Sequence, residues 1–289
     1  MNGDVYISIV PFSKDVAVAT SNWTSLWVRW DLWDAQNGTC SVSGYTSKSS
    51  CEAATTMVPG CSKPQYTNRG QCQVNGGIWN DFATVNGVWV PALHSTWNGC
   101  ITDRDKDPTA TANYDTRNTA PNILTPGTLF PAEQYASCPS PIMALSYDWT
   151  ALTNKINALV PAGNTNQGIG LAWGWQTLTN PPFTVPPFDS SYQYKQVIIL
   201  LSDGLNTENR WYTTASSIDA RQAITCSNIK TTGIVIYTVQ VNTGGDPTST
   251  VLKNCATDTS KFFMLTSGSQ IITTFSAIAT ELANMHLSQ

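Results

Sequence analysis

The chain has 289 residues, of which 41% are apolar and 10% aromatic, so it is able to bury a substantial hydrophobic core. Its formal net charge is −4 and it contains no basic cluster, which excludes the electrostatic footprint of a nucleic-acid-binding protein. Charged residues make up only 12% of the chain, about half the usual share. A surface made polar mainly by Ser, Thr, Asn and Gln is more typical of an exported protein than of a cytosolic one.

The cysteine content points to disulfide bonds. The eight cysteines are Cys40, Cys51, Cys61, Cys72, Cys100, Cys138, Cys226 and Cys255. No Cys-x-x-Cys pair occurs and the only histidines are His94 and His286, so zinc and redox motifs lack their usual spacing. Disulfides in an oxidising compartment are therefore favoured. Free buried thiols are the alternative for Cys226 and Cys255, and the four cysteines between 40 and 72 allow three pairings among which the sequence does not choose.

The amino-terminal residues predict a strand. Val5–Val10 is rich in β-branched residues, and Pro11 ends it because proline does not donate to a sheet ladder. Asp15–Thr20 is a candidate for a short partner strand. The first residues have no basic start followed by an apolar stretch, so they are not a signal peptide, and no run is long enough for a membrane helix.

Residues 22–140 differ in character from the rest and are predicted to be an insertion into a domain formed by residues 1–21 and 141–289. Tryptophans at 23, 27, 30 and 33 have helical spacing, and core packing of the insertion is favoured over a sugar-binding platform. The stretch Asp103–Asp107 alternates acids with Arg104 and Lys106 and lacks the glycine and final glutamate of an EF-hand. It is predicted to be a solvated charged loop.

After residue 140 the periodic pattern resumes. Asp148 is predicted to cap a helix over Trp149–Val160, and a second helix follows the loop at Thr165, with glycines that allow close packing on a sheet. The remaining elements are expected to be strand 196–201, helix 218–231, strand 234–241, helix 249–256, strand 261–265 and helix 269–287. This alternation predicts an α/β fold with a mostly parallel sheet and helices on both faces.

The candidate site lies where the apolar run Val197–Leu201 stops at Ser202-Asp203-Gly204. Ligands of open α/β sheets bind at the carboxyl ends of the strands, so Asp203 and the Thr165 loop are expected to meet at one rim. Asn206 and Thr207 are candidates for the same rim. The structural alternatives are that Thr165 caps its helix and that Asp203 accepts backbone N–H bonds within its turn.

These stretches together resemble the von Willebrand factor A (vWA) domain, and more narrowly that of bacterial TadG-like pilus-assembly proteins. The resemblance rests on Val10-Pro11-Phe12-Ser13, Gly170-Leu171-Ala172-Trp173-Gly174-Trp175, Leu201-Ser202-Asp203-Gly204-Leu205-Asn206-Thr207 and Asn254-Cys255-Ala256. It implies a metal site to which Thr165 and Asp203 contribute, with Mg²⁺ or another divalent cation. It also implies a disulfide between Cys100 and Cys138. Cys226 and Cys255 are close enough in chain order to pair as well.

One departure from the family pattern matters. The chain contains no Asp-x-Ser-x-Ser, the first metal-binding loop, so the first strand and helix of the fold are expected to be missing from these residues and the metal site incomplete. A preceding region would carry that loop and the membrane anchor of TadG-like proteins. The expected location is the bacterial periplasm or cell surface, tethered to the inner membrane.

The resemblance implies a non-enzymatic adhesion or assembly module that binds a protein partner, a pilus or envelope component. One alternative is a carbohydrate-binding surface protein that uses the Trp-rich insertion. Another is a metal-dependent hydrolase that uses Asp203 with Asp189 or Glu208. No Gly-x-Ser-x-Gly elbow and no phosphate-binding loop occurs in the sequence, so nothing selects an enzyme.

Overall fold

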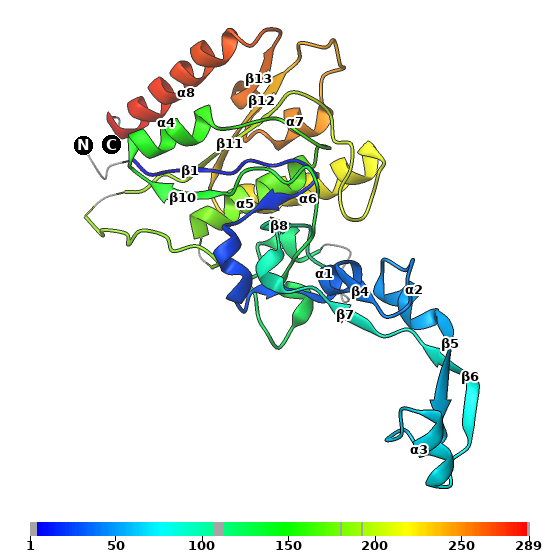
Figure 1. Cartoon of the computed structure of the whole chain (residues 1–289). Coiled ribbons are helices and arrows are strands. Elements are labelled where there is room, and N and C mark those ends of the chain that lie inside the picture. The colour runs from blue at the N-terminus through cyan, green and yellow to red at the C-terminus, as the bar shows by residue number, and fades with distance from the viewer. Residues whose placement is uncertain (1–4, 107–112, 180, 192, 288–289) are drawn as a thin grey trace. The chain divides into compact units, whose positions relative to one another are not determined.

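The computed structural model describes residues 5–106, 113–179, 181–191 and 193–287, and it divides the chain into two compact units (Figure 1). The first unit comprises residues 1–29 and 98–289, and the second comprises Trp30–Trp97. The predicted insertion, residues 22–140, is therefore longer than the unit that packs separately. Residues 98–106 and 113–140 belong to the first unit, and charged side chains among them pair with groups elsewhere in it, as described below.

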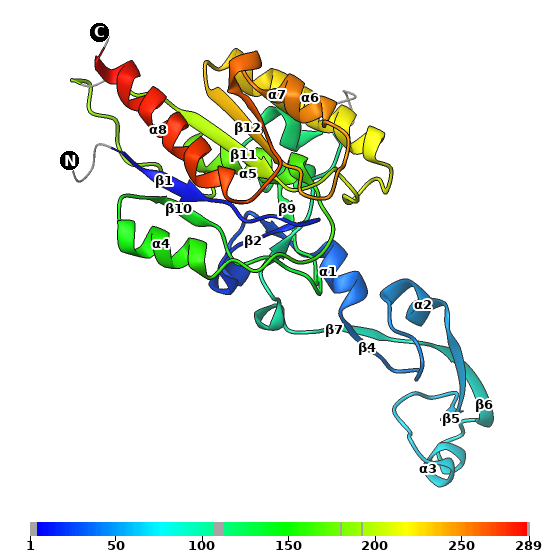
Figure 2. The ribbon, with the colours of Figure 1, turned by 90° about the horizontal axis from the view of Figure 1, so that it is seen from above.

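The first unit contains a parallel sheet and several short strand pairs (Figures 1 and 2). Its elements are β1 (Ile7–Ile9), β2 (Val16–Ala17), η1 (Thr20–Thr24), β3 (Val28–Arg29), β8 (Cys100–Ile101), η3 (Tyr114–Arg117), η4 (Pro126–Thr128), β9 (Phe130–Pro131), β10 (Met143–Ser146), α4 (Trp149–Asn157), α5 (Gln167–Thr179), β11 (Val197–Ser202), α6 (Ala215–Thr231), β12 (Val235–Val241), α7 (Thr250–Cys255), η5 (Thr259–Lys261), β13 (Phe262–Leu265) and α8 (Gln270–Leu287). Each predicted helix and strand after residue 140 is present, with ends shifted by up to three residues.

The parallel sheet is smaller than predicted. Strands β11, β12 and β13 pair in parallel in that order, whereas β1 pairs antiparallel with β10 in a separate two-stranded sheet. The fold is therefore mixed α/β, and the prediction of one mostly parallel sheet is wrong in extent. Met143–Ser146 was not expected to be a strand, and the candidate partner strand near residue 16 pairs with β8.

Two apolar layers enclose the parallel sheet. On one face, residues of α5, α6 and α7 pack against Ile198, Leu200 and Ile236. On the other face, Ile278 of α8 packs against Tyr237 and its neighbours on β12. The central strand β12 is covered on both faces, and every residue from Ile236 to Val241 is buried, including the polar Thr238 and Gln240.

Helix α4 begins as the sequence predicts. The Asp148 carboxylate accepts a hydrogen bond from the Ala151 amide at 2.9 Å, which satisfies one of the free N–H groups of the first turn. Within the described ranges, no helix combines the length and the apolar character needed to cross a membrane.

Gly170 on α5 provides a test of close packing. A Cβ added there would lie 2.4 Å from Cδ1 of the Phe12 ring. We expect Gly170→Ala to lower the free energy of unfolding by about 1–2 kcal/mol in chemical denaturation, because overpacking outweighs the higher helix propensity of alanine. Gly174→Ala is the matched control, since its nearest neighbour would be Ile198 at 3.7 Å, and it is expected to stabilise by up to about 1 kcal/mol. Equal effects of the two changes would contradict the packing argument.

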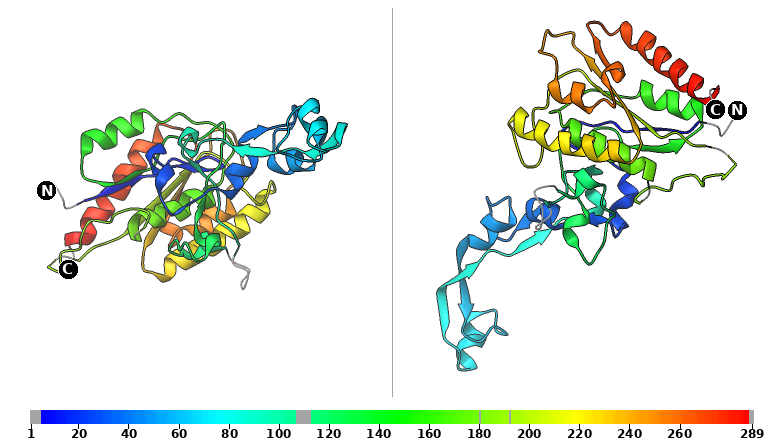
Figure 3. Two further views of the ribbon diagram at one scale, coloured as in Figure 1. Left: turned by 60° about the horizontal axis from the view of Figure 1, so that its bottom comes forward. Right: turned by 180° about the vertical axis from the view of Figure 1, so that it is seen from behind.

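The second unit consists of short helices and strands (Figure 3) and contains two disulfides. Its elements are α1 (Asp31–Gln36), β4 (Gly38–Cys40), α2 (Lys48–Ala53), β5 (Thr55–Cys61), α3 (Arg69–Val74), β6 (Trp79–Asn86), β7 (Trp89–Pro91) and η2 (His94–Thr96). Cys40 pairs with Cys51, and Cys61 pairs with Cys72. Strands β5 and β6 form an antiparallel ribbon.

The tryptophans near residue 30 do not form one helical face. Trp23 lies in η1 and is 42% exposed, whereas Trp33 lies in α1 and is buried. Trp30 stacks on His94 with ring centroids 3.9 Å apart and meets Trp33 and Trp97 edge to face. Helical spacing was misleading because the chain turns into β3 between Trp27 and Trp30, and most of these rings serve packing instead.

Candidate functional site

The loop before α5 and the loop after β11 lie side by side. The Thr207 amide donates to the Thr165 carbonyl at 2.9 Å, and the Thr165 amide donates to the Thr207 hydroxyl at 2.7 Å. The Gln167 side chain donates to the Gly204 carbonyl at 2.9 Å. The carboxyl end of β11 and the amino end of α5 therefore form one rim, which is where a parallel strand and its neighbouring helix are expected to meet.

A buried amide network fixes this rim to α6. Asn206 accepts from the Gln167 amide at 2.8 Å and donates to Asp219 and to Gln222, both at 2.7 Å. Gln222 in turn donates to the Gln167 side-chain oxygen at 3.1 Å. Gln167 and Gln222 are fully buried, and their side-chain amides are satisfied by each other, by Asn206 and by the Gly204 carbonyl, so the network joins both loops to α6.

The two residues implied to bind metal lie on the adjoining loops. Thr165 is half-buried and Asp203 is exposed, and no hydrogen bond to the Asp203 carboxylate occurs among the described residues. The structural alternative for Thr165 is wrong, because Asn166 caps α5: its side chain accepts from the Ile169 amide at 3.2 Å. The role of Thr165 and Asp203 as metal ligands stays a prediction.

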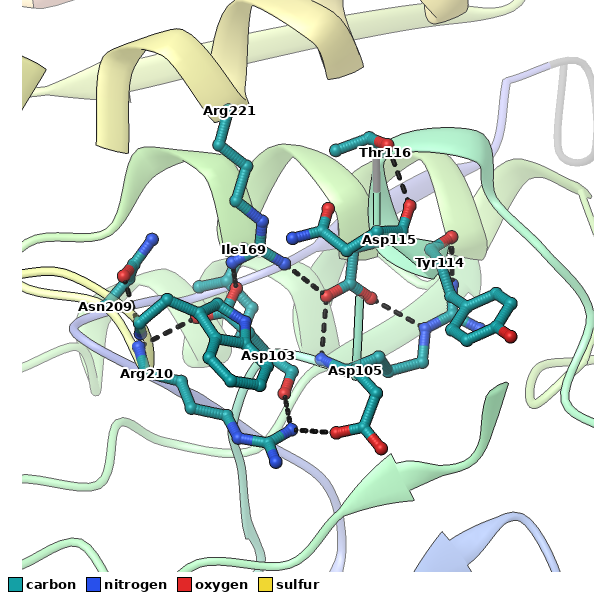
Figure 4. Close-up of polar contacts among 12 residues, drawn as sticks. Asp103, Asp105, Tyr114, Asp115, Thr116, Ile169, Asn209, Arg210 and Arg221 are labelled. Carbon is teal, nitrogen blue, oxygen red and sulfur yellow. Dashed lines mark hydrogen bonds and ion pairs between the residues drawn. The ribbon is translucent and has the colours of Figure 1, made fainter. Parts of the chain in front are cut away.

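A cluster of buried ion pairs lies beside the rim (Figure 4). Asp115 accepts from the Arg104 side chain at 2.7 Å and from Arg221 at 2.8 Å, and Arg221 also pairs with Asp103 at 2.6 Å. Asp103, Arg104 and Asp115 are almost completely buried. The second oxygen of Asp103 accepts from the Asn166 side chain at 3.0 Å, which joins this cluster to the loop that carries Thr165.

Asp105 extends the cluster toward the surface. It accepts two hydrogen bonds from Arg29, at 2.6 and 3.0 Å, and it pairs with Arg210 at 2.8 Å. Arg210 also donates to the Asp103 carbonyl at 2.7 Å. Segments more than seventy residues apart in sequence are therefore joined by charge-assisted bonds.

The prediction that Asp103–Asp107 forms a solvated loop is wrong for Asp103 and Arg104. Both are buried, Asp103 in an ion pair with Arg221 and Arg104 in an ion pair with Asp115. Asp107 lies outside the described residues. No local pattern indicated this for Asp103, because its counter-charge Arg221 is distant along the chain. The sequence shows which residues carry charge, but it does not show which of them form ion pairs.

The carboxyl groups of the cluster have pKa values that differ in direction. Burial raises the pKa of Asp103 above its usual value, and Arg221 only partly offsets it. Burial alone would also raise the pKa of Asp115, but Arg104 and Arg221 together bring that pKa below its usual value. The ionised Asp115 therefore stabilises the folded state above pH 3.8, the pKa of the carboxyl in the unfolded chain. This stability is lost as the pH falls and the folded carboxyl is protonated.

Asp15, just after Phe12 and Ser13, was not singled out in the sequence. Its side chain is fully buried, and neither carboxylate oxygen has a hydrogen-bond partner among the described residues. Burial and the neighbouring Glu133 raise the pKa of Asp15 to about 8, although Lys14 opposes this. Lys14 itself forms an ion pair with Glu133.

Of the rival hydrolase residues, Glu208 shares the rim with Asp203, whereas Asp189 belongs to another segment of the chain. Glu208 lies at the rim, where its amide donates to the Thr165 carbonyl at 3.4 Å and its carboxylate accepts from Asn164. Asp189 lies in an exposed turn and accepts from Ser191. His94 belongs to the second unit and pairs with Asp34 at 2.8 Å. Whether the chain is an enzyme stays a prediction.

The remaining disulfides lie in the first unit. Cys100 pairs with Cys138, as the resemblance implies, and Cys226 pairs with Cys255, so these two are not free thiols. Four disulfides in one chain indicate a compartment outside the reducing cytoplasm.

Comparisons with known proteins give only distant likenesses. No family model matches the chain, and no curated protein matches it. The vWF domain of the type V pili tip protein Mfa5 from Porphyromonas gingivalis is similar over 50% of this chain and 76% of its own, with 15% identity and a TM-score of 0.39. Proximal thread matrix protein 1 from the mussel byssus is similar over 46% of this chain and 28% of its own, with 20% identity and a TM-score of 0.33.

Proposed function

We propose that this chain is a non-enzymatic adhesion or assembly module of the bacterial cell envelope, built on a vWA-type fold and of the TadG-like kind. It acts by binding a protein partner, a pilus or envelope component. The observation that carries the proposal is the rim, where the Thr165 and Asp203 loops meet at the carboxyl end of a parallel strand. An inner-membrane tether, from a region outside these residues, belongs to the same proposal.

The proposal includes a divalent cation at the rim. An exposed carboxylate without a hydrogen-bond partner and a nearby threonine are suitable oxygen ligands for Mg²⁺, which keeps several of its waters. Among the described residues no group of three or more His, Cys, Asp or Glu side chains is placed to hold a metal, so Thr165 and Asp203 would supply only part of the shell. The other ligands would come from water, from a segment carrying Asp-x-Ser-x-Ser and from a carboxylate of the partner.

Calorimetric titration of Mg²⁺ into the longest gene product that contains residues 1–289 tests the metal. We expect saturable heat for the unchanged protein and none for Asp203→Ala, because that change removes the exposed carboxylate that the proposal assigns to the ion. Asp246→Ala, an exposed acid after β12, is the control and should bind as the unchanged protein does. Equal heats for all three proteins would remove Asp203 from the site.

A further inference from the structure

The two loops of the rim are tied directly to each other at an exposed position. Thr165 and Thr207 exchange two hydrogen bonds, at 2.9 and 2.7 Å, and Thr207 is open to solvent. Hydrogen bonds at a solvent-exposed edge open more readily than those of a packed core. The relative position of the two loops therefore depends on the buried groups beneath them. The amide network of Gln167 and Asn206 is one such support, and it joins both loops to α6.

A second buried support is a single carboxylate oxygen that contacts both loops. Oδ2 of Asp103 accepts from the Asn166 side chain, in the Thr165 loop, at 3.0 Å. The same oxygen accepts from the Arg210 amide, in the loop that follows Asp203, at 3.1 Å. Asp103 and Asn166 are each 1% exposed, so water does not readily replace the bond between them. Separation of the loops would leave a buried donor or acceptor without a partner, which is costly.

Asp103 belongs to neither loop and is held by contacts of its own. It follows β8, which pairs with β2. Its other carboxylate oxygen, Oδ1, pairs with Arg221 of α6 at 2.6 Å, and its backbone carbonyl accepts from the Arg210 side chain at 2.7 Å (Figure 4). These contacts leave the carboxylate little freedom to follow one loop away from the other.

We propose that Asp103 is the positioning residue of the rim. Its Oδ2 holds the Thr165 loop and the loop of Asp203–Arg210 in register, so that the groups that meet the partner are in place before it binds. Asp103 is buried and acts through Asn166 and Arg210 rather than by touching the partner. The proposal deepens the proposed function and rests on it, because it names the residue that sets the geometry of the same site.

Asn166→Ser tests the bridge without removing the helix cap. Serine is as good a cap as asparagine and is able to accept from the Ile169 amide, but its side chain is too short to reach Asp103. Residue-resolved amide exchange of the longest gene product that contains residues 1–289, in EDTA, is the measurement. We expect the Thr207 amide, which donates to Thr165, to exchange at least about tenfold faster in this variant, because the loops separate at a lower cost.

Asp103→Ala removes the acceptor itself and keeps the bond of Asn166 to the Lys14 carbonyl. The Thr207 amide should exchange at least as fast as in Asn166→Ser, and the Arg210 amide should lose its protection. Asn166→Ser decides alone if Asp103→Ala does not fold.

Two controls separate an effect on the rim from a general loss of stability. Asn68→Ser makes the same change at the cap of α3 in the second unit, and it should leave the exchange of Thr207 unchanged. Asp115→Ala removes a second buried carboxylate that bonds to Arg104 and Arg221, which lie outside both loops. It should speed the exchange of β12 amides, which requires global unfolding, but not that of Thr207, which requires only the loops to separate.

Three results would overturn the proposal. These are equal exchange of Thr207 in Asn166→Ser and the unchanged protein, exchange of Thr207 that is as fast in Asp115→Ala as in Asn166→Ser, and a Thr207 amide that is already unprotected in the unchanged protein. All samples contain EDTA, so a failure of the proposed metal binding produces none of these results. Faster exchange of Thr207 in the bridge variants, with both controls unchanged at that amide, supports the proposal.

Discussion

Arg221→Met is expected to lower the free energy of unfolding by about 3–5 kcal/mol, because it leaves two buried carboxylates without the cation they share. Arg221 pairs with Asp103 at 2.6 Å and with Asp115 at 2.8 Å, and both acids are almost fully buried. Methionine has a similar volume, so the loss reflects charge more than packing. Urea denaturation at pH 7, followed by tryptophan fluorescence, is the measurement.

The control for Arg221→Met is Lys253→Met, which removes an exposed cation from α7 and is expected to change stability by less than about 0.5 kcal/mol. The two variants should also differ in acid. Arg221 helps to keep the pKa of Asp115 below its usual value, so the variant that lacks Arg221 should lose less stability between pH 5 and 2 (about 1.4 kcal/mol for each pKa unit) than the unchanged protein. Similar denaturation midpoints for the two variants would show that the buried ion pairs do not stabilise the fold.

The part of the fold after residue 140 was predictable because local signals and tertiary structure agree there. Strand β12 is rich in β-branched and aromatic residues, and α8 repeats apolar residues at helical spacing, so each element could be recognised alone. The pairing of β1 with β10 was missed, since Met143–Ser146 is a four-residue strand with little pattern of its own. Short strands depend on their partners, which a single sequence does not show.

The candidate site was predictable only where it follows from topology. The meeting of the Thr165 and Asp203 loops follows from the end of a parallel strand and the start of the helix beside it. The buried ion pairs do not follow from any local pattern, because Asp103 and Arg221 are joined by tertiary contact alone. The pairing of Cys40 with Cys51 was likewise one of three possibilities until the coordinates decided it.

Asp15→Asn is expected to stabilise the protein at neutral pH. The folded pKa of Asp15 is about 8 against an ordinary value of 3.8, so the folded state takes up a proton that the unfolded chain does not hold at pH 7. This group therefore costs stability as the pH rises from about 4 to about 8, by about 1.4 kcal/mol for each pH unit. The groups that face Asp15 are Lys14 and the Thr102 hydroxyl, which favour its ionised form, and Glu133 and Asp103, which oppose it.

Asparagine has the shape of aspartic acid but does not titrate, so it removes this cost. The free energy of unfolding of Asp15→Asn should equal that of the unchanged protein near pH 4 and exceed it increasingly up to pH 8. The control Asp246→Asn, at an exposed position, should give a curve parallel to that of the unchanged protein. Guanidinium denaturation at each pH unit from 4 to 8 is the measurement. Parallel curves for Asp15→Asn and the unchanged protein would mean that Asp15 is ionised in the folded state and has a cationic or hydrogen-bonding partner there.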